Sequence, residues 1–183
     1  MKYIIVSDIH GSGWAAAQIT EIMKAEKPDF LLLLGDILYH GPRNPLPGGH
    51  DPLKVAAVLN IYKNNIIAVR GNCDAEVDQL LLDFPCMADY AVLADGQYSF
   101  FLTHGHLFPG LKPPFSLKPG SVFLSGHTHI KMLKEDKDLI YCNPGSTSLP
   151  KGCDSIPSYA QYQNGLLSLR RLDNSAILSE LQL

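Results

Sequence analysis

The spacing of apolar segments in the first half of the chain limits the fold more than any other feature. Short, almost wholly apolar segments at residues 2–7, 30–34 and 66–69 are typical of buried strands in a parallel sheet. Between them, residues 14–27 and 51–65 carry apolar side chains at helical spacing. Strands alternate with helices in this way in βαβ units, so we predict a parallel sheet with helices packed on it.

Beyond about residue 88 the pattern changes to strands and turns. After a predicted short helix at residues 75–83, we expect strands at 90–94, 98–104, 121–127, 130–135, 138–143, 158–163 and 165–172. Asn164-Gly165 between the last two is a strong hairpin signal. A βαβ half followed by a strand-rich half predicts an α/β fold of two packed mixed β-sheets flanked by helices. Without a repeat or a linker, residues 1–183 are expected to form a single domain.

The composition excludes several classes of function. The net charge is −3, with 46% apolar and 18% charged residues, so no electrostatic footprint for long nucleic acid is present. The four cysteines show no CxxC spacing, which argues against a thiolate zinc site and a thioredoxin motif. No segment approaches the roughly 20 apolar residues of a membrane span, and no signal sequence is recognisable. We therefore expect a cytoplasmic protein with free thiols and no membrane partner.

Polar side chains that can bind metal follow five of the predicted strands. The candidates, in chain order, are Asp8 and His10, Asp36, Asn72, His104 and His106, and His127 and His129. In open α/β sheets, ligands gather at the carboxyl ends of the strands. A single Asp-x-His after a strand would be a solvated strand end, but five strand ends of the same kind indicate one site.

A competing interpretation of the first strand end is a nucleotide-binding loop. Residues 11–16, GSGWAA, match the GxGxxA dinucleotide fingerprint after a strand and at the start of a helix. That loop requires the backbone to approach a pyrophosphate closely, and Asp8 and His10 would obstruct this approach. The glycines are better interpreted as a tight turn around a site.

The types of ligand indicate which metal would bind. Carboxylate, amide and imidazole without thiolate suit Mn²⁺, Fe²⁺, Ni²⁺ or Zn²⁺. The seven candidates other than His106 are too many for one catalytic ion, and they suit two divalent metal ions that share a carboxylate, as in phosphoryl-transfer sites. Two such ions with Asp8 and Asp36 leave two positive charges, which one hydroxide and one phosphodiester anion would balance. This count favours diesters over monoester dianions.

The pattern resembles the calcineurin-like metallophosphoesterase family. That family's signature runs DxH, GD, GNH followed by an acid, H, and GHxH, and this chain has DIH, GD, GNCD, HGH and GHTH in the same order across residues 8–129. The short chain and NPGS at 143–146 look like the small single-domain phosphodiesterase branch. The resemblance implies a four-layer αββα sandwich of two packed mixed β-sheets with helices outside.

The resemblance also implies the roles of individual residues. One metal would take Asp8, His10, Asp36 and His129, and the other would take Asp36, Asn72, His104 and His127. Asp36 would bridge them, Mn²⁺ being the expected metal, and a hydroxide between the ions would attack phosphorus in line. Asp74 matches the acid that orients the neighbouring residue in the family.

Cys73 departs from the family pattern, which has a histidine near the leaving group at this position. A thiol is a weak substitute for an imidazolium general acid. We predict that Cys73 narrows the enzyme towards good leaving groups such as aryl phosphodiesters, although a metal ligand, a nucleophile and a plain spacer are alternative roles. His106 is interpreted either as a phosphate contact or as a cap of its own loop.

Two long loops rich in proline and glycine, at 38–51 and 107–120, each follow a candidate site residue. Loops of this length are typical of lids, and an interface in a homo-oligomer is the alternative. Arg43 and His50 in the first loop could contact a phosphate or lie exposed. Arg70 is interpreted either as an ion-pair partner or as a substrate contact.

The leading functional hypothesis is a dinuclear metal-dependent phosphodiesterase that hydrolyses small aryl or nucleotide-like diesters. A phosphomonoesterase or dinucleoside-polyphosphate hydrolase is the first alternative, which Cys73 weakens. A non-catalytic protein-binding scaffold on the same fold is the second, and the complete set of candidate ligands argues against it.

Overall fold

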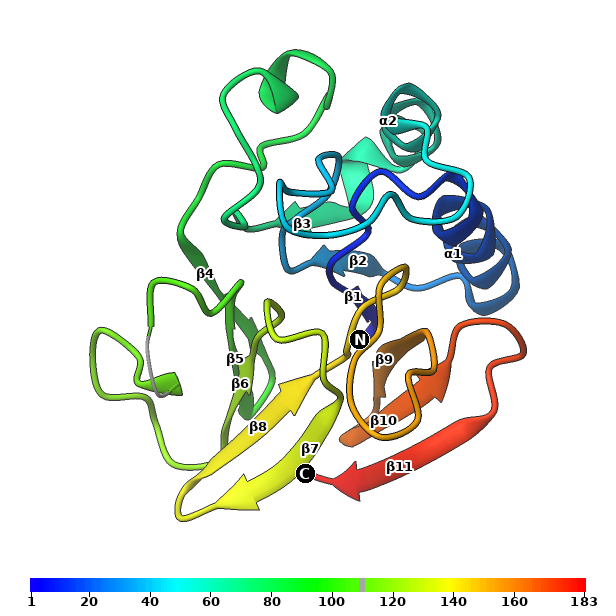
Figure 1. Cartoon of the computed structure of the whole chain (residues 1–183). Helices are drawn as coiled ribbons and strands as arrows, with labels where there is room; N and C mark the ends of the chain where they lie inside the picture. The colour runs from blue at the N-terminus through cyan, green and yellow to red at the C-terminus, as the bar shows by residue number, and fades with distance from the viewer. Residues whose placement is uncertain (109–110) are drawn as a thin grey trace.

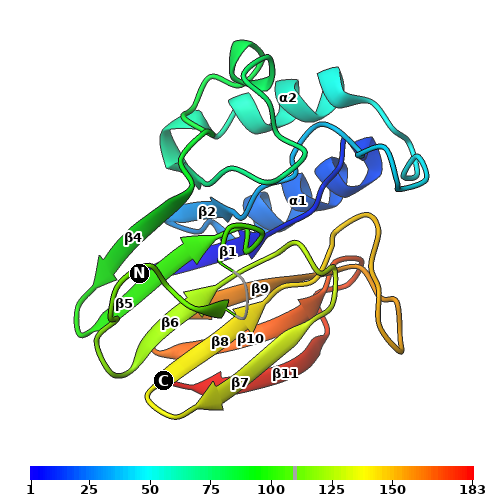
Figure 2. The same cartoon turned by 60° about the vertical axis from the view of Figure 1, so that its left-hand side comes forward.

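A computed structural model describes residues 1–108 and 111–183, and in it two mixed β-sheets pack face to face (Figures 1 and 2). The six-stranded sheet has the order β11-β10-β9-β1-β2-β3. Its strands are β1 Lys2–Val6, β2 Phe30–Leu33, β3 Ile66–Ala68, β9 Ser158–Gln163, β10 Leu166–Arg171 and β11 Ile177–Gln182. The strands β1, β2 and β3 run parallel, and β9 joins β1 antiparallel, so the sheet is mixed.

The five-stranded sheet has the order β4-β5-β6-β8-β7. Its strands are β4 Tyr90–Asp95, β5 Tyr98–Thr103, β6 Ser121–Leu124, β7 Met132–Asp136 and β8 Leu139–Asn143. The central strands β5, β6 and β8 are parallel, and the edge strands β4 and β7 are antiparallel to their neighbours.

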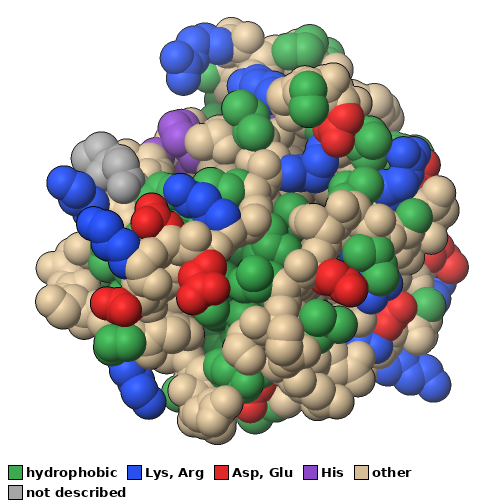
Figure 3. All heavy atoms as spheres, turned by 90° about the horizontal axis from the view of Figure 1, so that it is seen from below, with side chains coloured by type: hydrophobic (Ala, Val, Ile, Leu, Met, Phe, Trp, Pro, Cys, Tyr) green, Lys and Arg blue, Asp and Glu red, His purple; other side chains and the backbone are tan. Residues whose placement is uncertain are grey.

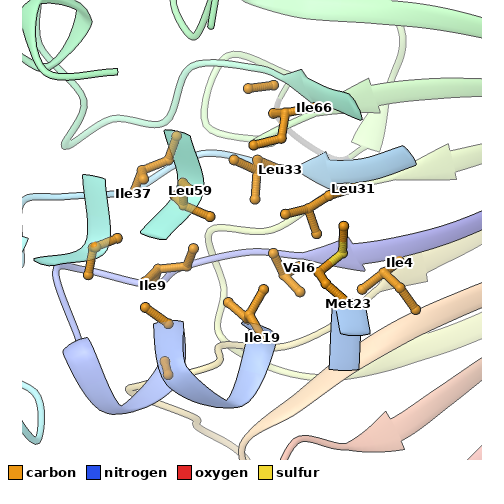
Figure 4. Packing of buried hydrophobic residues seen from close by; sticks show 14 of the residues in the cluster. Ile4, Val6, Ile9, Ile19, Met23, Leu31, Leu33, Ile37, Leu59 and Ile66 are labelled. Atoms are coloured by element: carbon orange, nitrogen blue, oxygen red, sulfur yellow. The ribbon is translucent and has the colours of Figure 1, made fainter. Parts of the chain in front are cut away.

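Two α-helices cover the outer face of the six-stranded sheet. Helix α1 (Gly13–Glu26) begins after Ser12, whose hydroxyl accepts from the Ala15 amide, and α2 (Pro52–Asn60) begins after Asp51, whose carboxylate caps the Lys54 amide. Figure 4 shows their apolar side chains against the strands, with Ile19 and Met23 of α1 facing side chains of β1 and β2. Hydrophobic burial of this kind fixes the helices over the strands that lead into the candidate site.

Alternation along β1 divides the core into two layers. Ile4 and Val6 point towards the helices, whereas Tyr3 and Ile5 lie in the layer between the two sheets. There the Tyr3 ring meets Phe100 of β5 edge-on, with ring centroids 5.6 Å apart. Because β1 is buried on both faces, its sequence is a continuous apolar run, as predicted.

The outer face of the five-stranded sheet is covered differently. Phe101 of β5 is fully buried there, with Phe108 and Phe115 of the following loop packed edge-on against it at 5.7 and 5.8 Å between centroids. Within the described residues, a loop therefore forms the outer layer that the resemblance would assign to helices. The prediction of an α/β fold with two packed mixed sheets is confirmed.

Several local predictions need correction. Residues 75–83 form only a short 3₁₀ turn at Asp78–Leu80, because packing buries just one of the three consecutive leucines, Leu82. The helix predicted over 51–65 ends at Asn60, and a 3₁₀ turn follows at Lys63–Asn65. Strand β11 was not predicted at all. The prediction for the loop 107–120 falls partly on residues 109–110, which lie outside the described residues.

All four cysteines are free thiols. In the part of the chain that the structure describes, no helix has both the length and the apolar character needed to cross a membrane. On the face seen in Figure 3, basic and acidic side chains are interspersed around hydrophobic ones, so that face has no single sign of charge.

Candidate metal centre

Loops from both sheets meet at the carboxyl ends of the parallel strands. The segment after β1 carries Asp8 and His10, and the turns after β2 and β3 carry Asp36 and Asn72. From the five-stranded sheet, β5 leads to His104, and the turn after β6 carries His127 and His129. The site therefore lies at the seam between the sheets, and each sheet supplies part of it.

The side chains converge on two carboxylates. Asp8 Oδ1 lies 3.3 Å from His129 Nε2 and 3.6 Å from His10 Nε2. Asp36 Oδ2 lies 3.4 Å from His104 Nε2 and 3.7 Å from His10 Nε2. His104 Nε2 also lies 3.1 Å from Asn72 Oδ1. The His10 imidazole thus stands between the two carboxylates, so the groups form one continuous cluster.

The three buried imidazoles are oriented by backbone carbonyls. Each places Nδ1 within hydrogen-bond distance of a carbonyl oxygen: His10 with Tyr39 at 2.9 Å, His104 with Leu34 at 2.7 Å, and His129 with Leu149 at 2.6 Å. A carbonyl can only accept, so Nδ1 must carry the proton, and Nε2 is left to face the cluster. This arrangement is typical of imidazoles that bind metal.

The donor set fits a divalent cation. Asp8 Oδ1 is buried and has no hydrogen-bond partner within the described residues. It belongs to two groups of candidate ligands, Asp8 with His10 and His129, and Asp8 with Asp36 and His104. Buried polar atoms are normally paired, and an unpaired carboxylate oxygen facing imidazole nitrogens is satisfied when a cation binds between them.

Electrostatic interactions between the carboxylates and the facing imidazoles shift the pKa values of both kinds of group. Burial opposes ionisation of Asp8, yet the facing His10 and His129 imidazoles outweigh it and hold the pKa of Asp8 far below its usual range. Burial would likewise lower the pKa of His104, but the carboxylates of Asp36 and Asp8 raise it to about 9. The cluster is thus a set of carboxylates held ionised at the centre of facing imidazoles.

The backbone of the site is unusual. Asp8, His10, Asp36, His127 and His129 have φ of 55°, 50°, 54°, 68° and 60°. Non-glycine residues rarely adopt this left-handed region, and such strain concentrates at functional sites.

The segment after β8 holds the first of these strained residues in place. The hydroxyls of Ser146 and Ser148 both donate to the Asp8 carbonyl, at 2.7 and 3.0 Å. The same segment supplies the Leu149 carbonyl that orients His129. These supporting serines were not singled out by sequence reasoning, which noted only NPGS as part of a resemblance.

Asp74 lies beneath the cluster and acts on the backbone. Its Oδ2 accepts from the amides of Asp36 and Gly71 at 2.8 and 2.7 Å, and its Oδ1 accepts from Ile37 at 2.8 Å. The side chain is buried. Asp74 therefore ties the turn after β2 to the turn after β3, which makes it a positioning residue for Asp36.

Cys73 faces the candidate ligands. Its Sγ lies within 4.8 Å of the candidate ligand atoms of His10 and Asp36, and the side-chain amide of Asn72 donates to it at 3.2 Å. Its own backbone amide donates to Asp36 Oδ1 at 2.8 Å. Burial and the neighbouring carboxylates raise the pKa of the thiol to about 12.

Two cavities open beside the cluster, and His127 lines both. A polar cavity of about 450 Å³ is lined by Asp36, Asn72, Cys73, His129 and residues of the loop 38–51. A mainly apolar cavity of about 520 Å³ includes His106, Phe108, Ile130 and Met132. His127 is exposed between them, and its ring centroid lies 5.1 Å from that of His104.

The remaining candidates separate into two groups. Arg43 lines the polar cavity and His106 lines the apolar one. Lys151, which the sequence analysis did not identify, also lines the polar cavity. His50 does not reach the polar cavity, since its ring packs against His40, with centroids 5.3 Å apart. Arg70 is engaged by Asp89, with 2.6 Å between Nη2 and Oδ1, in agreement with the ion-pair interpretation.

Comparison with known proteins places the chain in a family. The model of the calcineurin-like phosphoesterase superfamily domain matches residues 1–163. Phosphodiesterase YfcE of Escherichia coli (strain K12) is 42% identical over 180 residues, covering 98% of this chain and 97% of that protein. A solved structure of YfcE, described as a phosphoesterase from E. coli, superposes with a TM-score of 0.95 at 41% identity, covering 100% and 99% of the two chains. Phosphodiesterase MJ0936 of Methanocaldococcus jannaschii is 28% identical over 153 residues, covering 79% of this chain and 83% of that protein. The chain belongs to the calcineurin-like phosphoesterase superfamily.

Proposed function

We propose that the protein is a metal-dependent phosphodiesterase that hydrolyses small phosphodiesters with two divalent cations, Mn²⁺ being the expected one. The observation that carries the proposal is the pair of buried carboxylates, Asp8 and Asp36, facing three imidazole Nε2 atoms at the seam between the sheets. Full-length similarity to a phosphodiesterase, YfcE, supports the same reaction class.

Two cations would be held around Asp36. One would take Asp8, His10, Asp36 and His129, and the other would take Asp36, Asn72, His104 and His127. When bound, a cation pair polarises the phosphoryl group and acidifies a water molecule, which supplies the attacking hydroxide. Asp36 would be the shared ligand, in accord with the family pattern, and its Oδ2 faces both His10 and His104.

The protein groups prepare this chemistry in advance. The carbonyl partners of the buried imidazoles hold a proton on Nδ1, so that Nε2 is the nitrogen turned towards a cation, and Asp74 fixes the turn that carries Asp36. Groups that are already oriented need no reorganisation when charge develops on the phosphoryl oxygens. His127 is exposed between the cavities and is positioned to contact the phosphoryl group as well as a cation.

The charge balance supports a diester. Asp8 and Asp36 are the carboxylates that face the imidazole nitrogens, whereas Asp74 points away into a set of backbone amides. Two negative ligands leave a cation pair with two positive charges, which a hydroxide and a singly charged diester neutralise. Arg43 and Lys151 at the polar cavity add positive charge, and this observation keeps a phosphomonoesterase or dinucleoside-polyphosphate hydrolase as the second candidate.

The test is hydrolysis of an aryl phosphodiester and an aryl phosphomonoester with Mn²⁺, with EDTA and Asp8→Asn as controls. Turnover of the diester that EDTA and the variant abolish supports the proposal, and the number of Mn²⁺ bound per chain, measured by titration calorimetry, should be two. Preference for the monoester would support the second candidate. Absence of metal-dependent turnover of either substrate would favour a non-catalytic scaffold.

A further inference from the structure

The candidate metal centre opens into two cavities that differ in charge and polarity, and the exposed His127 is the side chain that lines both. A phosphodiester has two organic arms that diverge from one phosphorus atom. A phosphoryl group held beside His127 would therefore direct its arms into different surroundings. The chemistry of each cavity indicates which kind of arm it accepts.

The apolar cavity suits a flat, uncharged ring. Phe108, Leu111, Ile130 and Met132 supply its apolar walls, and no charged lysine, arginine, aspartate or glutamate is among its described lining residues. The imidazoles of His106 and His127, with centroids 6.2 Å apart, stand at its end nearest the metal centre. Binding sites for small organic groups combine apolar walls with a few polar atoms in this way.

Polar groups also line the same cavity. Thr128 is exposed and His106 is half-buried, so both side chains are accessible to an occupant. An occupant with a hydrogen-bonding atom therefore gains more here than a hydrocarbon chain. Planar rings with polar edges, such as nitrophenyl groups and nucleobases, meet this requirement.

The polar cavity suits an anionic arm. Arg43 and Lys151 both line it, and among the described residues neither forms an ion pair with a carboxylate. The Lys151 amide donates to the His129 carbonyl at 2.9 Å, which ties this lysine to the metal centre. Guanidinium and ammonium groups at the rim of a cavity attract phosphate and carboxylate groups.

We propose that the natural substrate is an asymmetric phosphodiester, with a planar uncharged ring on one arm, which occupies the apolar cavity, and an anionic group on the other, which contacts Arg43 and Lys151. This inference rests on the proposed function and names the substrate class for the same site. Ile130 and Met132 are then specificity residues for the ring, and Arg43 and Lys151 are specificity residues for the anionic arm.

Three diesters test the proposal with Mn²⁺. Methyl p-nitrophenyl phosphate carries a ring, methyl 2,2,2-trifluoroethyl phosphate carries none, and 2-phosphonoethyl p-nitrophenyl phosphate carries a ring and an anionic arm. Nitrophenol release is followed by absorbance, and trifluoroethanol release is followed by fluorine NMR. The ringless substrate reports on the metal centre alone. It is needed because Ile130 directly follows His129 in the chain, and a substitution of Ile130 that displaced His129 would lower the rate on this substrate as well.

The expected result is a separate loss for each arm. Ile130→Ser should lower kcat/KM about tenfold for both ring-bearing diesters and leave the ringless one unchanged. Lys151→Ala should lower kcat/KM about fivefold only for the phosphonoethyl diester, mainly through KM. Ile61→Ser and Lys118→Ala, which change exposed residues away from both metal-facing cavities, serve as matched controls and should change none of the rates.

Two kinds of failure are distinguishable. If the wild-type protein with Mn²⁺ hydrolyses none of the three diesters, the proposed function is wrong. If it hydrolyses them but Ile130→Ser matches Ile61→Ser, or lowers the rate on the ringless diester equally, the assignment of the apolar cavity is overturned. Equal effects of Lys151→Ala on all three diesters would overturn the assignment of the anionic arm.

Discussion

Asp74→Asn is the substitution that most directly tests how the fold holds Asp36. The Asp74 carboxylate is buried and accepts three backbone hydrogen bonds, from Asp36, Ile37 and Gly71. The asparagine amide can place its single oxygen where two of these donors point, but its NH₂ group then faces the third. One buried N–H group therefore loses its acceptor, and the other two keep an acceptor that is neutral instead of charged.

The magnitude follows from these contacts. A lost hydrogen bond to a buried charged group costs about 2 kcal/mol, and for a chain of this size this corresponds to a melting temperature about 4–8 °C lower. Because Asp74 orients Asp36 without touching the cluster itself, we also expect Mn²⁺ to bind at least about tenfold more weakly. Thermal unfolding in EDTA measures the first effect, and titration calorimetry with Mn²⁺ measures the second.

Asp78→Asn is the matched control. Asp78 is about as buried as Asp74, at 7% and 8% exposure, but its side chain accepts one backbone hydrogen bond, from Ala75 at 2.9 Å. Asparagine can keep that bond, so the free energy of unfolding should fall by at most about 1 kcal/mol, with Mn²⁺ affinity unchanged. If the two variants bind Mn²⁺ with affinities within a factor of about two, Asp74 does not position Asp36 and the reasoning fails.

Three further predictions follow from the same site. Mn²⁺ at a hundred times its dissociation constant should stabilise the wild-type fold by about 2.7 kcal/mol and raise the melting temperature by about 5–10 °C, whereas Asp8→Asn should show no rise in the same titration. Ser146→Ala removes a donor to the Asp8 carbonyl and the acceptor of the Leu149 backbone amide, and should lower the unfolding free energy in denaturant by about 2 kcal/mol. Ser121→Ala, which removes a buried hydroxyl with no partner in the described part of the chain, should cost less than half of that. Cys73→His should raise rates on diesters with poor leaving groups more than on those with good ones, and an unchanged ratio would show that Cys73 does not limit leaving-group departure.

The elements that could be predicted are those whose burial requires a recognisable pattern of apolar residues in the sequence. Strands β1 and β2 are buried on both faces and α1 on one, so the runs at 2–7 and 30–34 and the periodicity at 14–27 were sufficient. Strand β11 is an edge strand with almost every residue exposed, so its sequence carries no alternation. The three leucines at residues 80–82 favoured a helix by their local propensity. The sequence could not show that tertiary packing buries just one of them.

The candidate site was predictable for a topological reason. Parallel strands place their carboxyl ends at one edge, so polar residues that follow such strands must lie near one another. The roles of the individual ligands stay predictions. Lys151 could not be found, because it approaches the site through a loop whose path depends on the contact of its amide with His129. The role of Asp74 as a backbone acceptor likewise requires knowing how two turns meet.

The seam between the sheets has a mechanical consequence. Asp8, His10, Asp36 and Asn72 belong to one sheet, and His104, His127 and His129 belong to the other. At this end of the sandwich, polar groups take the place of the apolar side chains that join the sheets elsewhere. A bound cation pair would act there as a cross-link between sequence-distant halves of the chain. Chelation would then remove a structural cross-link as well as a catalytic cofactor, and on unfolding the two sheets should separate first at that end.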